Sequence, residues 1–211
     1  HGLALYDQGC YIEALDDFRR ASEIHPGMAE LESQYGATLS HLGRSEEALK
    51  RCQLAVKLNP LCPEVHQRLG MVLSDLGRFQ EAMDQYQAAL QLNPSDAVML
   101  TQFAWALATC PVDSLRDGPK AVEYALKAQR NTGGTQPDVL VALAAAYAET
   151  GRFPEAVATA KRASEIVARD GQTNLTATLA GQIEQYEKRQ PMREKTPKSR
   201  DRKSRTQPGL R

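Results

Sequence analysis

Aromatic residues are scarce in this chain, at 6% of its 211 residues, and its charges cancel. A core with few rings and many small side chains is made by close approach of packed elements, which favours helices packed on helices. The 26 Lys and Arg residues balance 26 Asp and Glu residues, so no bulk field indicates nucleic acid or a membrane surface as the partner. No apolar run approaches the roughly 20 residues that a membrane-spanning helix needs.

Cysteine pairs are also missing, because none of the four cysteines stands in a C-x-x-C spacing. The sequence therefore predicts neither a disulfide framework nor a zinc site. Cys62 and His66 are four residues apart and could share a helix face, but a structural zinc site needs four ligands and there is no second pair.

Catalytic motifs are absent as well. The carboxylate pairs Asp16-Asp17 and Glu46-Glu47 lie near Lys and Arg, as in solvated ion pairs on a helix. The stretch NTGGT at Asn131 lacks the Lys-Ser/Thr of a phosphate-binding loop. We predict no enzymatic activity, no cofactor and no metal site.

A period of 34 residues runs through the first half of the chain. Five columns of small or turn-forming residues share this period over three copies. A period of this length indicates a repeat architecture. The columns are Gly2, Gly36 and Gly70; Gly9, Gly43 and Gly77; Ala14, Ala48 and Ala82; Ala21, Ala55 and Ala89; and Pro26, Pro60 and Pro94.

Each copy contains two amphipathic stripes separated by a turn. The first stripe in the third copy is Val65, Leu69, Val72, Leu73 and Leu76, and the second is Ala82, Tyr86, Ala89 and Leu90. Gly77 lies between them, where a helix end favours a left-handed residue. Pro94 ends the second helix because it cannot donate the next backbone hydrogen bond. Each unit is therefore predicted to be helix, tight turn, helix and stop.

The small residues are expected at points of close helix contact, with Gly70 facing Ala82 across the turn. Phe18, Cys52 and Tyr86 share one column and are expected to fill the hollow that the small residues leave. Cys52 is thus interpreted as a small buried hydrophobe rather than a redox residue.

This pattern of Gly, Ala, aromatic, Ala and Pro on a 34-residue frame resembles the tetratricopeptide repeat. The resemblance implies an all-α fold, a right-handed α-solenoid of helix-turn-helix repeats closed by a C-terminal capping helix. The division that it implies is a partial repeat at 1–28, repeats at 29–62, 63–96, 97–136 and 137–170, a capping helix at 171–189 and a basic, disordered tail at 190–211. The capping helix is expected to bury Leu175, Leu179, Ile183 and Tyr186.

The fourth repeat departs from the frame, because CPVDSLRDG enlarges its inter-helix turn by five residues. The sequence from there to RQPMRE resembles, more loosely, the C-terminal module of large bacterial repeat proteins. The chain also begins in the middle of a repeat, so we expect upstream sequence. Two functions follow: a non-catalytic scaffold that holds a partner segment, or an accessory module of a larger enzyme, for example a membrane glycosyltransferase-like protein, whose catalytic part lies upstream.

In the tetratricopeptide family, the first helix of each repeat lines a concave groove that binds partners. Carrying those columns over gives the candidate groove residues Glu30, Ser33, Glu64, Gln67, Met71, Asp75, Thr101, Trp105, Asp138, Val141 and Glu149. Its acidic members favour a basic or neutral peptide. The clamp with which some members hold a terminal carboxylate is not implied, since only Arg68 fits among the matching positions.

Trp105 with Met71 is the candidate hot spot, because aromatic anchors commonly dominate binding energy. Trp105 could instead pack as core beneath the CPVDSLRDG insertion.

From Pro191 onward the chain has eight Lys or Arg residues and two Asp or Glu residues. This tail is interpreted as a solvated terminus, a contact for an anionic surface or nucleic acid, or a targeting signal. Its lack of aromatic residues argues against RNA. Self-association is a further possibility. A cytoplasmic location is slightly favoured, and a periplasm-facing part of a membrane protein is the alternative.

Overall fold

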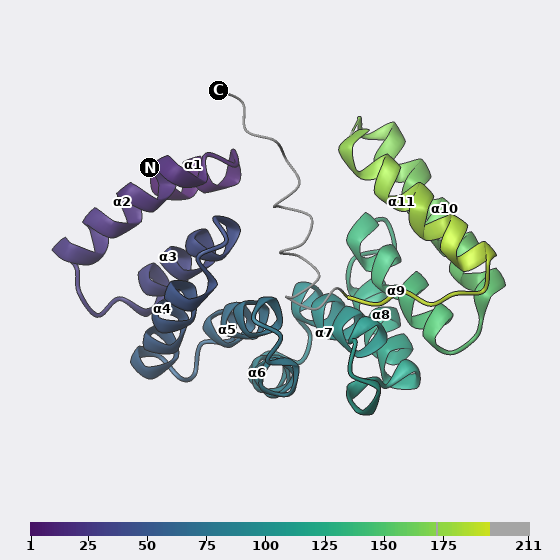
Figure 1. The fold of residues 1–211 in the computed structure, drawn as a ribbon, viewed down its shortest axis with the longest axis horizontal. Helices are drawn as coiled ribbons and strands as arrows, with labels where there is room; N and C mark the ends of the chain where they lie inside the picture. The colour runs from purple at the N-terminus through teal and green to yellow at the C-terminus, as the bar shows by residue number, and fades with distance from the viewer. Residues whose placement is uncertain (172, 195–211) are drawn as a thin grey trace, which may run out of the picture. The chain divides into compact units, whose positions relative to one another are not determined.

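A computed structural model describes residues 1–171 and 173–194 of the chain (Figure 1). Within them, helices are the only regular secondary structure, which confirms the predicted all-α fold. They are α1 (Gly2–Asp7), α2 (Tyr11–Ile24), α3 (Ala29–His41), α4 (Ser45–Leu58), α5 (Pro63–Asp75), α6 (Phe79–Leu92), α7 (Ala97–Thr109), α8 (Gly118–Asn131), α9 (Pro137–Glu149), α10 (Phe153–Arg169) and α11 (Thr173–Glu187), with a short 3-10 helix at Asp113–Leu115.

The helices belong to two compact units, His1–Asn93 and Pro94–Arg211. In the first unit, α1 packs on α2, α3 on α4 and α5 on α6, and α3 also contacts α5. In the second unit, α7 packs on α8, α9 packs on both α7 and α10, and α11 packs on α10. Helix-turn-helix pairs are therefore the building blocks of both units, and the first helices of neighbouring pairs touch each other.

Glycine on the first helix of a pair admits a larger side chain from the second helix. A Cβ added at Gly70 would lie 2.7 Å from Cε1 of Tyr86, and one at Gly36 would lie 2.5 Å from Sγ of Cys52. A Cβ at Gly2 would meet the ring of Phe18 at 3.2 Å. The prediction that this column fills the hollow is confirmed, and the atoms nearest to a Cβ at Gly70 belong to the ring of Tyr86.

A repeated turn joins the two helices of a pair. Gly77 has φ +76°, and the N–H of Arg78 donates to the carbonyl of Leu73 at 2.9 Å, which closes the end of α5. The Arg78 side chain then reaches forward to Glu81, with Nη2 and Oε2 2.6 Å apart. The same Gly-Arg-x-x-Glu turn, with an arginine–glutamate pair, recurs at Gly43-Arg44-Glu47 and Gly151-Arg152-Glu155.

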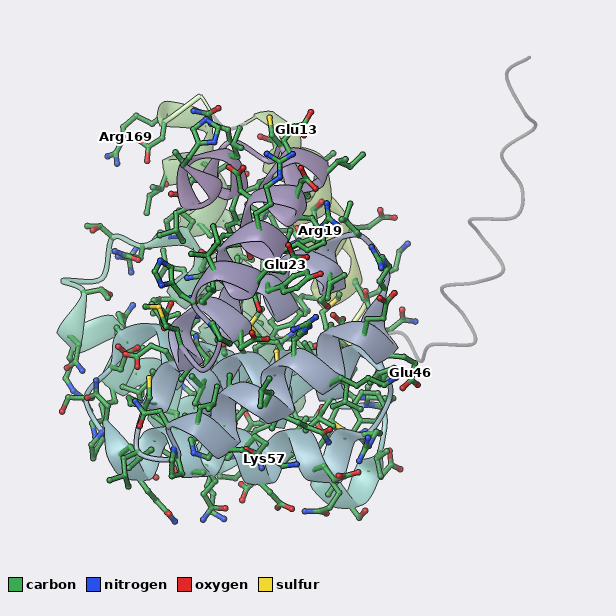
Figure 2. The ribbon with its side chains drawn as sticks, turned by 90° about the vertical axis from the view of Figure 1, so that its left-hand side faces the viewer. Glu13, Arg19, Glu23, Glu46, Lys57 and Arg169 are labelled. Atoms are coloured by element: carbon green, nitrogen blue, oxygen red, sulfur yellow. The ribbon has the colours of Figure 1, made fainter. Side chains whose placement is uncertain are left out.

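Charged side chains cover the outward sides of the second helices in the first unit. Figure 2 shows Glu13, Arg19 and Glu23 on α2 and Glu46 and Lys57 on α4, all pointing into solvent. These sides carry the solvated charge that the sequence predicted there, so the apolar stripes face the neighbouring helices.

The last helix covers the apolar side of α10. Tyr186 of α11 is fully buried in a cluster with Ala144, Ala148, Ala156 and Ala160, and Leu179 is also buried. Leu175 is 38% exposed, so the buried stripe begins one turn later than expected. The chain then continues to residue 194 against the same unit, in contrast to the disorder expected from residue 190. Residues 195–211, which hold most of the basic tail, lie outside the described part.

The packing of Cys52 against Gly36 can be tested through the ionisation of the Cys52 thiol. Burial raises the pKa of its thiol from 9.0 to about 12, so above pH 9 an unfolded chain loses a proton that the folded chain keeps. Stability should therefore fall as the pH rises, by up to about 1.4 kcal/mol per pH unit from this group. We expect urea unfolding to show a smaller loss in Cys52→Ala than in wild type when the pH is raised from about 8 to about 11. Equal losses in the two proteins would show that the thiol is not the group responsible.

Candidate functional site

Six residues of α3 and α5 form one face of the first unit, here called the α3/α5 face: Glu30, Ser33, Ser40, Arg68, Met71 and Asp75. Nη1 of Arg68 donates to Oε1 of Glu30 and to Oγ of Ser33, both at 3.0 Å. Oγ of Ser40 donates to Oδ2 of Asp75 at 2.7 Å. The polar groups of this face are thus tied across the two helices, while the side chain of Met71 is 41% exposed.

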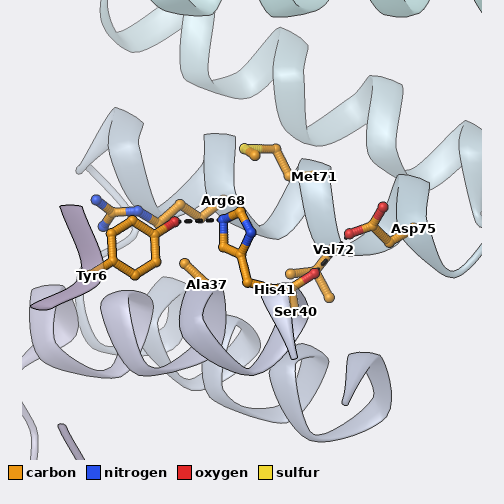
Figure 3. Close-up of a pocket in the computed structure, with 8 residues that line it drawn as sticks. All are labelled: Tyr6, Ala37, Ser40, His41, Arg68, Met71, Val72 and Asp75. Carbon is orange, nitrogen blue, oxygen red and sulfur yellow. Dashed lines mark hydrogen bonds between the residues drawn. The ribbon is translucent and has the colours of Figure 1, made fainter. Parts of the chain in front are cut away.

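A pocket of about 90 Å³ opens on this face between Met71 and the aromatic residues of the first helices (Figure 3). Nε2 of His41 lies 2.8 Å from the hydroxyl of Tyr6, and the imidazole stacks on Tyr11 with ring centroids 4.5 Å apart. Burial, followed by the nearby Tyr11, raises the pKa of Tyr6, so its hydroxyl stays protonated at neutral pH. Hydrogen-bonding groups and the exposed side chain of Met71 thus line the same pocket.

Two other predicted residues of α5 lie near the helix start. Glu64 accepts a hydrogen bond from Sγ of Cys62 at 3.0 Å, and Gln67 is partly buried. The nearby His66 contacts Oε1 of Gln85 and the carbonyl of Pro60, at 2.8 and 2.9 Å. Cys62 and His66 thus each contact protein groups within hydrogen-bond distance.

In the second unit, Trp105, Thr109 and Glu149 form the α7/α9 face. Glu149 is held by Arg116 of the CPVDSLRDG insertion, whose Nε donates to Oε1 of Glu149 at 2.8 Å. Arg116 also donates to the carbonyl of Cys110 at 2.9 Å and to Oδ1 of Asp113 at 2.6 Å. Burial lowers the pKa of Arg116, but the hydrogen bonds to Asp113 and Glu149 and the negative charges of these two residues together raise it by more, so the guanidinium stays charged.

Residues 191–194, here called the return segment, lie on the α7/α9 face. Figure 1 shows the chain leaving α11 and running back toward α7. The N–H of Glu194 donates to the carbonyl of Thr109 at 2.8 Å, and Nε1 of Trp105 donates to Oε1 of Glu194 at 2.9 Å. Nη1 of Arg193 forms an ion pair with Oε2 of Glu149 at 2.7 Å. Trp105 is therefore partly covered by the chain's own C-terminal residues, which neither interpretation of this residue had predicted.

The remaining predicted residues of the second unit do not join this contact. Thr101 donates to the carbonyl of Ala97 within its own helix at 2.6 Å. Val141 packs against the cluster that contains Leu140 and Leu179, and Asp138 is exposed in the first turn of α9. The structure thus brings together Trp105 and Glu149 among the candidates in this unit.

Several residues of these faces were missed from sequence. Tyr6 belongs to the pocket, and Arg116 orients Glu149, yet only the insertion around Arg116 gave a signal. Arg193 and Glu194 lie in a stretch whose composition predicts disorder, so nothing in their pattern indicated a contact with Trp105.

The part of the chain that the structure describes contains no group of three His, Cys, Asp or Glu side chains that could hold a metal ion. None of its helices has the length and apolar character needed to cross a bilayer. The arrangement on both faces consists of hydrogen bonds, ion pairs and apolar contact.

Two parts of the chain match family models of the tetratricopeptide repeat, at residues 63–96 and 137–162. The chain therefore contains tetratricopeptide repeats. No curated protein sequence matches it.

Solved tetratricopeptide-repeat structures share its fold. A thermophilic protein of this kind from Thermus thermophilus is 25% identical, with a TM-score of 0.73, and the match covers 86% of this chain and 95% of that one. MamA is 22% identical with a TM-score of 0.61, covering 81% of this chain and 96% of that one. YrrB, described as a tetratricopeptide-repeat protein with an unusual peptide-binding site, is 19% identical with a TM-score of 0.57, covering 78% of this chain and 82% of that one.

Proposed function

We propose that this tetratricopeptide-repeat protein is a non-catalytic scaffold that binds a segment of a partner protein on the first helices of its helix pairs. In the first unit, the site is the α3/α5 face. The observation that carries this proposal is the exposed Met71 beside the Tyr6–His41 pocket. A flexible thioether adapts to different apolar side chains, and surfaces that bind many partners use methionine in this way.

The polar residues around Met71 support a neutral partner segment at this face. Arg68 offsets the charge of Glu30, and Asp75 accepts a hydrogen bond from Ser40. These groups form a polar rim around the exposed methionine, which resembles the layout of protein interfaces. Arg68, the one residue that would fit a carboxylate clamp, is bonded to Glu30 and Ser33. The structural relative described as having a peptide-binding site supports the same class of function.

Met71→Glu tests this proposal. A charge at the centre of an apolar contact should weaken partner binding by about tenfold or more, because a carboxylate would have to be desolvated. Partners are captured from an extract of the organism that encodes the chain, identified, purified and titrated calorimetrically against wild type and the variant.

Leu54→Glu is the matched control. Leu54 is 38% exposed, close to the 41% of Met71, but it lies on α4 rather than on the α3/α5 face. A partner that binds wild type and Leu54→Glu equally and Met71→Glu weakly supports the proposal. Equal binding to all three proteins would exclude the α3/α5 face as the binding surface.

A further inference from the structure

The return segment shows what the α7/α9 face recognises, because each of its residues meets a different kind of group. Met192 packs against the apolar cluster around Tyr186 and Ala148. Arg193 pairs with the carboxylate of Glu149, and Glu194 accepts from the indole of Trp105. The second unit thus contacts an apolar, a basic and an acidic side chain of the segment in succession.

Backbone contacts fix the path of the segment between α11 and α7. Nε2 of Gln185 donates to the carbonyl of Pro191 at 3.0 Å, and the N–H of Glu194 donates to the carbonyl of Thr109. Hydrogen bonds to main-chain groups at both ends, with side-chain contacts between them, are how extended peptides are commonly held. Glu149 is also positioned in advance by Arg116, so the acceptor for the arginine does not depend on the segment itself.

We propose that the α7/α9 face is a binding site for extended peptides of the sequence apolar–Arg–Glu, and that the return segment occupies it until a partner with the same chemistry takes its place. This proposal rests on the proposed function, because it too treats the first helices of the pairs as the peptide-binding surface. It concerns a different unit and a different ligand. Because the segment is tethered, its effective concentration is in the millimolar range, so a partner must compete with it.

The test uses the capped synthetic peptide Gln-Pro-Met-Arg-Glu and the full chain. In the variant Arg193→Ala/Glu194→Ala, the segment loses its ion pair and its indole contact, so that Met192 is held only by its apolar packing and can be displaced by the methionine of the peptide. We expect the peptide to bind this variant at least tenfold more tightly than wild type. The chain has one tryptophan, and Trp105 contacts the segment, so its fluorescence should change in the variant and return toward the wild-type emission when the peptide is added.

Two controls separate this site from general effects. The peptide Gln-Pro-Ala-Ala-Ala should not bind the opened variant. Glu184→Ala/Lys188→Ala removes an exposed ion pair of 2.6 Å on α11, whose two side chains take no part in the contacts given above for the return segment, and should leave peptide binding as weak as in wild type.

Equal peptide binding by wild type and the opened variant would overturn the proposal, as would equal binding of the two peptides. Glu149→Gln in the opened variant should weaken the peptide at least fivefold, and an unchanged affinity would also overturn it. Far-ultraviolet circular dichroism shows whether each variant is folded, and Arg193→Ala alone gives the same comparison if the double variant does not fold. A negative result here leaves the Met71 experiment unaffected, since that experiment probes the first unit.

Discussion

Gly70→Ala is expected to destabilise the first unit by about 2 kcal/mol or more, although alanine is the better helix former. The added methyl group would lie 2.7 and 2.9 Å from Cε1 and Cδ1 of Tyr86. The Tyr86 ring is buried and 7% exposed, so it cannot move aside without disturbing the contact between α5 and α6. Urea unfolding followed by circular dichroism measures the change in the free energy of unfolding.

Gly181→Ala is the control for this prediction. Gly181 also lies inside a helix, but a Cβ added there meets no atom within 4 Å. Alanine at this position should stabilise the protein by about 0.5 to 1 kcal/mol, through helix propensity alone. Two substitutions of the same kind should therefore have opposite signs, and a stabilising Gly70→Ala would show that the ring of Tyr86 does not determine this contact.

Tyr186→Ala is expected to have the largest effect in the second unit, a loss of about 3 to 5 kcal/mol. Tyr186 is fully buried where α9, α10 and α11 meet, and Met192 packs against the same cluster. Removing the ring leaves a cavity and takes away the support of the return segment. Thermal unfolding and Trp105 fluorescence should both change, because the indole contacts the segment that would be released.

Tyr186→Phe distinguishes the ring from its hydroxyl group. Within the described residues the buried hydroxyl has no hydrogen-bond partner, and burial raises its pKa. A buried polar group without a partner is unfavourable, so the phenylalanine variant should be as stable as wild type or more stable. A loss of more than about 1 kcal/mol in Tyr186→Phe would show that the hydroxyl is bonded.

The helix pairs could be predicted because they depend on spacing within one copy of the repeat. Gly77 and Pro94 mark helix ends through local backbone geometry, and the structure has α5 ending at Asp75 and α6 at Leu92. The filling of the hollow by Cys52 and Tyr86 also followed from their shared column. The spacing did not show that the ring of Tyr86 reaches across to α5 and lies nearest to Gly70.

The candidate site was less accessible from sequence. The repeat pattern gives the helix face on which a residue lies, but it does not show which polar groups of α3 and α5 bond each other. Trp105 and Glu194 are 89 residues apart, and no periodicity links them. The contact depends on where α11 ends and on Arg116 holding Glu149, which are features of the packed second unit.

The Gly-Arg-x-x-Glu turns have a consequence for how the chain folds. The bond from Arg78 to Leu73 and the pair of Arg78 with Glu81 join residues that are close in sequence, so a turn can form with little loss of chain entropy. Proteins rich in such local contacts fold quickly, and in repeat proteins folding can start in any unit and spread to its neighbours. With the same turn at three places in the chain, folding has several independent starting points and does not depend on one nucleus.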